Sequence, residues 1–340
     1  MFINNHTSGE GMNKVRFGII GFGGFAERSI APAIRASRNA ELIAIQKRDR
    51  AAASEKAAAL SIPLSFSTVG ELVRHPEVDA IYIASANSAH YSETLAAAAA
   101  GKHVIVEKPM AMNADESAEM ISACKKAGVQ LMVAHMLRFS PLLVRMKEMI
   151  RNGEIGESIS ASSGFMYNAG LSQRKWLFDR AIAGGGPVYD IGVHCIDTLR
   201  FLLDDEVTDV SAILQPLPTS ARTEETGLVT LRFSKGIAAS VYSSFRAPFR
   251  RTFIEVVGTK GMLRAFQFTT VQTTVQLIRE YESPEGRIDS VVEEISIPNL
   301  YITQIEKFAE SILEGKISPI SGVEGLRNQE ILDRVFDSRR

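Results

Sequence analysis

The sequence contains only two cysteines and one tryptophan among 340 residues. Cys124 and Cys195 lie far apart, form no CxxC pair and cannot supply a disulfide framework. This scarcity of thiols predicts a reducing, cytoplasmic compartment. No apolar run approaches the roughly 20 residues that a membrane span requires. Residues 1–13 are polar and lack the apolar centre of a signal peptide, so we interpret them as a disordered leader.

The chain also lacks an excess of charge. It has 38 basic and 39 acidic residues, for a formal net charge of −1, and no basic stripe interleaved with aromatics. This balance argues against nucleic acid or a membrane as a partner. The histidines and cysteines show no metal-ligand spacing, so we predict no metal site. The length of 340 residues suits two domains.

The first part of the chain alternates strand-like and helix-like segments. Six compact β-rich runs are expected as strands at 15–20, 41–46, 64–66, 79–84, 103–107 and 129–134. Helical patterns separate them, and Pro32 predicts a kink or break in the first helix. Alternation at this spacing predicts parallel βαβ units in a doubly wound sheet.

The pattern changes near residue 135. Helices are expected at 142–151, 191–203, 301–313 and 323–336, with a strand near 158–166. Between residues 207 and 297, successive β-rich runs are separated by turn motifs, namely SKG (234–236), GTKG (258–261) and SPEG (283–286). The second part is therefore predicted to be an α+β domain built on a broad antiparallel sheet.

A glycine motif follows the first predicted strand and opens the first helix. It has the form GxGxxA, and its expected cofactor contacts are Gly21, Gly23, Gly24, Phe25 and Ala26. The first glycine allows a tight turn, the second allows close approach of a diphosphate, and the small last residue lets the helix pack on the strand. The amides of the helix N-terminus then face the phosphates. The order of strand, loop and helix predicts a dinucleotide site.

The end of the second strand bears on the choice of cofactor. An acidic residue there would bind the adenosine ribose and repel a 2′-phosphate. This chain has Lys47 and Arg48, which can neutralise that phosphate. Asp49 follows directly and competes as a ribose acceptor. We therefore favour NADP(H) and keep NAD(H) as the alternative.

Two further segments carry reactive side chains. Lys108 follows Glu107 at the end of the fifth strand, where ligands of an open α/β sheet bind. Asp190 and His194 follow a triple glycine within residues 184–197, and a spacing of four places them on one helix face. A carboxylate and an imidazole so placed suit proton transfer. The structural alternative is a buried histidine beside a capping aspartate, with Lys108 as a surface lysine.

Together, GFGGFA (21–26), EKP (107–109) and GGGPVYDIGVHCID (184–197) resemble the glucose-fructose oxidoreductase/inositol dehydrogenase family. The resemblance covers nearly the whole chain. It implies a Rossmann NAD(P)-binding domain at 14–134 and a substrate-binding and oligomerisation domain at 135–340, with a large, mostly antiparallel sheet. It also implies a homodimer or homotetramer formed through that sheet.

The resemblance implies an NAD(P)-dependent oxidoreductase that moves a hydride between nicotinamide and a sugar, a polyol such as inositol, or a sugar-derived carbonyl. The family's catalytic positions fall on Lys108, Asp190 and His194. Further cofactor contacts are expected from Ser85, Asn87, His90, Glu107 and Lys108. Substrate contacts are expected from Arg138, Tyr167 and Trp176. Two alternatives stay open, a hydrolase that oxidises its sugar transiently with bound NAD and a non-catalytic NAD(P)-sensing regulator. The second would be expected to lose the three reactive residues.

Overall fold

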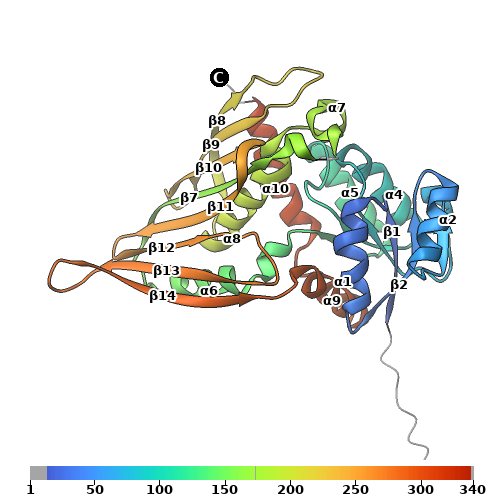
Figure 1. The fold of residues 1–340 in the computed structure, drawn as a ribbon, viewed down its shortest axis with the longest axis horizontal. Helices are drawn as coiled ribbons and strands as arrows, with labels where there is room; N and C mark the ends of the chain where they lie inside the picture. Colours follow the sequence, from blue (N-terminus) through green and yellow to red (C-terminus); the bar gives the residue numbers. More distant parts are fainter. Residues whose placement is uncertain (1–13, 173, 338–340) are drawn as a thin grey trace, which may run out of the picture.

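The computed structural model describes residues 14–172 and 174–337, so the predicted leader at 1–13 lies outside the described residues. Figure 1 shows two domains side by side, a helix-covered sheet formed by the first part of the chain and a broad sheet formed by the second. None of the described helices is long and apolar enough to cross a bilayer.

The first domain is a parallel six-stranded sheet in the order β3-β2-β1-β4-β5-β6. Its strands are β1 (Val15–Ile20), β2 (Ala40–Gln46), β3 (Leu64–Phe66), β4 (Ala80–Ile83), β5 (His103–Val106) and β6 (Leu131–Val133). Its helices include α2 (Arg50–Ala59), α3 (Val69–Val73), α4 (His90–Ala99) and α5 (Ala114–Ala127). The strand order reverses between β1 and β4, where such sheets bind ligands. The predicted doubly wound sheet is confirmed.

The first helix is broken, as Pro32 predicts. A π-helical turn, η1 (Ala26–Ile30), leads into α1 (Ala31–Ala36), and Pro32 lies in the first turn of α1. Proline cannot donate a backbone hydrogen bond, and a π turn accommodates the missing bond.

The second domain is built on eight strands in the order β14-β13-β12-β11-β7-β10-β9-β8. They are β7 (Ser158–Asn168), β8 (Val207–Gln215), β9 (Thr226–Phe233), β10 (Ala238–Ser244), β11 (Arg246–Gly258), β12 (Gly261–Phe266), β13 (Thr273–Glu282) and β14 (Ile288–Ile297). Every neighbouring pair is antiparallel except β7 and β10, which run parallel. The predicted mostly antiparallel sheet is confirmed.

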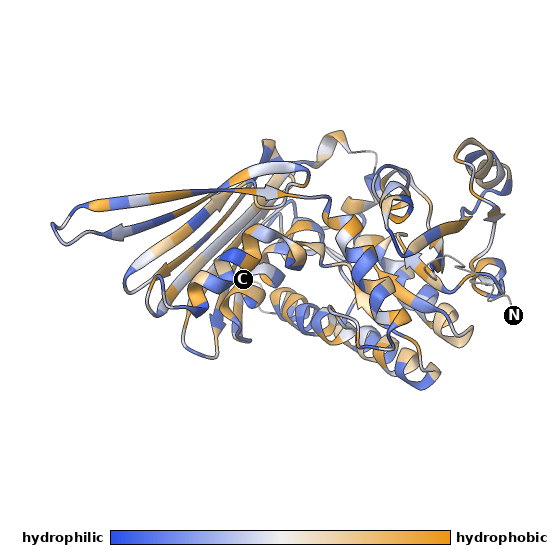
Figure 2. Cartoon of the chain, turned by 90° about the horizontal axis from the view of Figure 1, so that it is seen from below, coloured by the Kyte–Doolittle hydropathy of each residue, from blue (hydrophilic) through white to orange (hydrophobic). Residues whose placement is uncertain are grey.

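Helices cover one face of this sheet (Figure 2). They include α6 (Pro141–Arg151) and α8 (Val193–Leu203), which continues from a π turn, η6 (Val188–Gly192). Burial alternates along β9. Leu228 and Thr230 are exposed, whereas Val229 and Leu231 are buried. The period of two shows that one face packs on the helices and the other faces outward.

Helix α9 (Leu300–Leu313) departs from the expected division at residue 135. Its residues Ile305 and Phe308 are fully buried in the core of the first domain, and the Phe308 ring lies 6.3 Å from the Phe17 ring of β1. The chain therefore returns to the nucleotide domain after the large sheet. The sequence pattern predicts the helix but does not show which sheet its apolar face covers. The last helix, α10 (Gly322–Asp337), packs against both α5 and α8.

Candidate active site

Lys108 follows β5, where the preceding residue, the partly buried Glu107, holds the chain in place. The Tyr82 hydroxyl donates to Glu107 Oε1 at 2.6 Å, and the Lys108 amide donates to Glu107 Oε2 at 3.3 Å. Burial raises the pKa of Glu107. Glu107 thus fixes the strand end from which Lys108 projects.

The Lys108 side chain reaches the second domain. Its Nζ donates to the backbone oxygen of Asp190 at 2.6 Å and lies 3.2 Å from Asp190 Oδ1. Only 13% of the lysine side chain and 8% of the aspartate side chain are exposed, so this ion pair is shielded from water. The two predicted catalytic segments therefore meet, although they are far apart in the sequence.

Two more side chains bind the Asp190 carboxylate. The Tyr167 hydroxyl donates to Oδ2 at 3.1 Å, and the Arg174 guanidinium donates to Oδ1 and Oδ2 at 3.3 Å each. Burial opposes ionisation of Asp190, but the charges of Lys108 and Arg174 outweigh it and hold the pKa well below its usual range. Asp190 is therefore an anion shared by two cations.

His194 lies one turn beyond Asp190, at the start of α8. Its Nδ1 is buried without a hydrogen-bond partner, and its ring lies 6.2 Å from the Phe165 ring. Burial, assisted by the charge of Lys108, lowers the pKa of His194 well below its usual value. The imidazole is therefore neutral near pH 7. In the described residues, Asp190 makes no hydrogen bond to His194.

The glycine motif forms the loop that its sequence predicts. Gly21 has a φ of +72°, and a Cβ there would lie 2.6 Å from the backbone of Ser85, so a side chain is excluded. A Cβ on Gly23 would meet only the Gly21 oxygen, at 3.8 Å, which leaves the outer side of the loop open. Ala26 is fully buried. The open loop and the first amides of the helix fit a dinucleotide diphosphate.

The basic pair lies beside this loop. Lys47 Nζ donates to the Phe22 oxygen at 2.9 Å, while Arg48 is exposed. Asp49 caps α2, because its Oδ1 accepts from the Ala52 amide at 3.0 Å. Asp49, the alternative acceptor for the ribose, therefore also serves as the N-cap of α2.

Three residues expected to contact the cofactor also make structural hydrogen bonds. His90 is fully buried, with Nδ1 2.9 Å from the Pro109 oxygen, and burial lowers its pKa to about 4. Asn87 is also buried and donates to the Ala183 oxygen at 2.9 Å. The Ser85 hydroxyl donates to Glu93 at 2.5 Å. The His90 ring is thus part of the packing between the start of α4 and the segment that follows β5.

Arg138, which we expected to contact the sugar, pairs with two carboxylates inside the protein. Its guanidinium lies 2.7 Å from Asp197 Oδ1 and 2.8 Å from Glu324 Oε2. Asp197, the last residue of the GGGPVYDIGVHCID motif, is itself a buried residue of α8. Arg138 is therefore part of an interior ion-pair network, which the sequence does not distinguish from a sugar contact.

The sequence analysis missed Arg174 and Phe165, which contact the predicted residues directly. Trp176 is partly buried, and the Arg174 guanidinium lies 5.9 Å from its ring. Arg174 occurs in the basic segment just before the glycine run, and that position is the only signal of its role in the sequence. Phe165 belongs to an ordinary β-rich run and carries no such signal.

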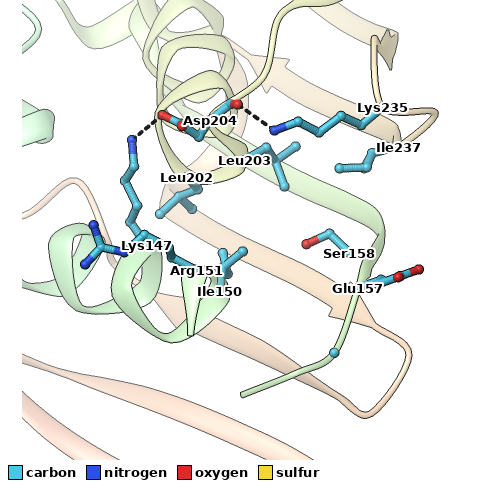
Figure 3. A pocket seen from close by; sticks show the side chains of 11 residues that line it. Lys147, Ile150, Arg151, Glu157, Ser158, Leu202, Leu203, Asp204, Lys235 and Ile237 are labelled. Atoms are coloured by element: carbon cyan, nitrogen blue, oxygen red, sulfur yellow. Dashed lines mark hydrogen bonds and ion pairs between the residues drawn. The ribbon is translucent and has the colours of Figure 1, made fainter. Parts of the chain in front are cut away.

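A separate cavity of about 450 Å³ lies at the far end of α6 and α8 (Figure 3). Lys147 and Lys235 both bind Asp204 at its edge. None of the predicted site residues lines this cavity.

The switch-point glycine loop, together with a lysine and a neutral histidine at the junction of two domains, defines a dinucleotide-dependent oxidoreductase. The chain belongs to the GFO/IDH/MocA family. Residues 15–135 match the oxidoreductase family model with an NAD-binding Rossmann fold, and residues 143–264 match the GFO/IDH/MocA C-terminal domain.

Characterised relatives match over most of their length. The chain is 33% identical to 1,5-anhydro-D-fructose reductase of Ensifer adhaerens, over 89% of this chain and 90% of the relative. It is 31% identical to D-xylose 1-dehydrogenase (NADP(+)) 2 of Haloferax volcanii, over 95% and 96%. The crystal structure of aldose-aldose oxidoreductase from Caulobacter crescentus superposes with a TM-score of 0.86 at 27% identity, covering 96% of this chain and 97% of that one.

Proposed function

We propose that this enzyme transfers a hydride between NAD(P)(H) and a sugar, a polyol or a sugar-derived carbonyl. One observation carries the proposal, namely that Lys108 of the nucleotide domain bonds to Asp190 one turn from the neutral His194 of the other domain. The names of the Ensifer and Haloferax relatives, a reductase and a dehydrogenase of sugars, support it.

The chain's own side chains supply the proton chemistry. In the oxidising direction, neutral His194 accepts the proton of the reacting hydroxyl. The Lys108 ammonium stabilises the negative charge that develops on the substrate oxygen. Ionised Asp190 holds that ammonium in place and accepts a hydrogen bond from a neighbouring substrate hydroxyl. A nicotinamide, when bound, supplies the acceptor or donor of the hydride.

The preferred cofactor in this proposal is NADP(H). Lys47 lies against the glycine loop and Arg48 is exposed beside it, so both can meet a 2′-phosphate. Asp49 is the acid best placed to accept from a ribose, and its carboxylate caps α2. NAD(H) remains the alternative. The two buried, unpaired cysteines agree with a cytoplasmic location.

The partner proposed for the open sheet face is a second copy of this chain. An apolar row crosses that face through paired residues of adjacent strands, namely Ile213, Leu228, Tyr242, Phe253 and Phe266. Gly164 lies within the row, and the Phe253 ring fills the space its side chain would take. An exposed row of this extent favours burial in a homodimer or homotetramer.

The proposal is tested by following nicotinamide absorbance while the protein is offered polyols, aldoses and ketoses with each cofactor. We expect a net change with at least one compound. Cleavage of a glycoside without any net change would indicate the hydrolase instead. Cofactor binding with neither reaction would indicate the sensor and would refute the proposed oxidoreductase.

A further inference from the structure

Arg250 lies where the pairing of β11 with β7 is interrupted. The register shifts between Arg246 and Arg251, so Arg250 falls in a bulge opposite the end of β7. Its guanidinium lies 5.2 Å from the Phe165 ring, whereas that of the adjacent Arg251 lies 5.9 Å from the Phe266 ring in the exposed row. The two neighbouring arginines therefore point to opposite faces of the sheet, and Arg250 points to the face that carries the active site.

Arg250 is close to the reacting groups. The Phe165 ring contacts the Arg250 guanidinium at 5.2 Å and the His194 ring at 6.2 Å, so both side chains lie against the same aromatic ring. A six-carbon sugar whose reacting hydroxyl meets His194 can place a distal substituent near Arg250.

The guanidinium of Arg250 is positioned without being neutralised. It donates to the Thr269 backbone oxygen at 3.1 Å and to Thr269 Oγ1 at 2.8 Å. Within residues 14–172 and 174–337, no carboxylate lies at ion-pair distance from it. By contrast, Lys108 and Arg174 both share Asp190. Arg250 is thus a positioned, solvent-exposed cation for which the described residues supply no anion.

We propose that Arg250 binds an anionic group of the substrate, so that the substrate is a sugar or polyol bearing a carboxylate or a phosphate. This inference rests on the proposed function and names its substrate class. A planar guanidinium pairs bidentately with either anion, and a charge-assisted bond of this kind is among the strongest available to a protein. Phe165 beneath it limits the orientations it can adopt.

The test measures binding to the NADP⁺-saturated enzyme through the emission of Trp176, the single tryptophan of the chain, which lies beside Arg174. The probes are D-glucose, D-glucuronate and D-glucose 6-phosphate at constant ionic strength. At least one anionic sugar is expected to bind about tenfold or more tightly than glucose. Which one does so distinguishes carboxylate from phosphate.

Matched variants assign the preference to one side chain. In Arg250→Met the advantage of the anionic sugar is expected to fall below about threefold, whereas Arg250→Lys retains part of it. Arg251→Met removes an equal charge from the opposite face and is expected to keep the native preference.

Three outcomes would overturn the inference. They are equal binding of glucose and the anionic sugars, no binding of either anion, and an effect of Arg250→Met on NADP⁺ affinity alone, which would make Arg250 a cofactor contact. The proposed function is tested by a separate measurement, the change in nicotinamide absorbance. Its failure would leave a binding preference that depends on Arg250 intact.

Discussion

The Lys108 ammonium lies 2.6 Å from the backbone carbonyl oxygen of Asp190, and each residue belongs to a different domain. The proposed reactive site therefore forms where the two domains pack together, since neither EKP (107–109) nor the glycine-rich segment (184–197) holds it alone. Lys108 Nζ also binds the Asp190 carboxylate. The two contacts with Asp190 hold the ammonium in place before any substrate enters. This preorganisation is what stabilisation of a developing oxyanion requires.

Replacing either reacting side chain should abolish most of the activity. Lys108→Met removes the cation beside the substrate oxygen, and His194→Phe removes the proton acceptor. We expect each to lower kcat by about two orders of magnitude in steady-state assays. Lys126→Met, at an exposed lysine of α5, should leave kcat unchanged. Losses below about threefold in both site variants would contradict the assigned roles.

The basic pair after β2 should determine cofactor choice. In Lys47→Ala/Arg48→Ala, the KM for NADP⁺ is expected to rise by about tenfold or more, while the KM for NAD⁺ stays within about twofold. Arg50→Ala is the matched control, because Arg50 is also exposed but is bound to Glu71 at 2.6 Å. A native enzyme that uses both cofactors equally would show that the pair does not read the 2′-phosphate.

The open face of the large sheet should hold two subunits together. Tyr242→Glu places a charge in the apolar row and is expected to shift the protein toward monomer in sedimentation velocity experiments. Val144→Glu on α6 is a control, because both native side chains are 38% exposed and Val144 lies outside the sheet. A native monomer at micromolar concentration would refute this interface.

The glycine loop can be tested by cofactor binding alone. Gly21→Ala introduces a methyl group 2.6 Å from the Ser85 backbone at a φ of +72°, so we expect loss of cofactor binding and a lower melting temperature. Gly23→Ala meets no such obstacle within the protein, so it should weaken cofactor binding with little effect on stability. Equal effects of the two variants on stability would contradict this separation.

Local patterns in the sequence predicted most of the elements and their order. The strands at Val15–Ile20 and Leu64–Phe66 have the predicted bounds, because short-range patterns of apolar residues define them. The six parallel strands follow from βαβ alternation, and the turn motifs mark the strands of the second sheet.

The remaining features depend on contacts between distant segments. Arg138 was expected to bind sugar, and its ion pair with Asp197 follows from the contact of α8 with the segment Met136–Phe139. Arg250 reaches the site only because β11 bulges beside β7, and strand pairing of this kind leaves no mark in a single sequence. His90 shows the same limit, since its burial against Pro109 follows from how two loops meet.

His135 should make the stability of the fold depend on pH. It is fully buried, with Nε2 2.9 Å from the Asn328 amide nitrogen, and burial outweighs the attraction of Asp197 and lowers its pKa to about 4. An unfolded histidine titrates near pH ~6.5, so the unfolded chain binds the proton first. The free energy of unfolding should therefore fall as the pH decreases from about 6.5 to about 4, by up to ~1.4 kcal/mol per pH unit. His90, with the same lowered pKa of about 4, adds to this slope.

Urea unfolding between these pH values measures the effect. His135→Gln should reduce the slope, whereas His75→Gln, near the surface, should retain it. An unchanged slope in His135→Gln would show that protonation of this ring does not limit stability.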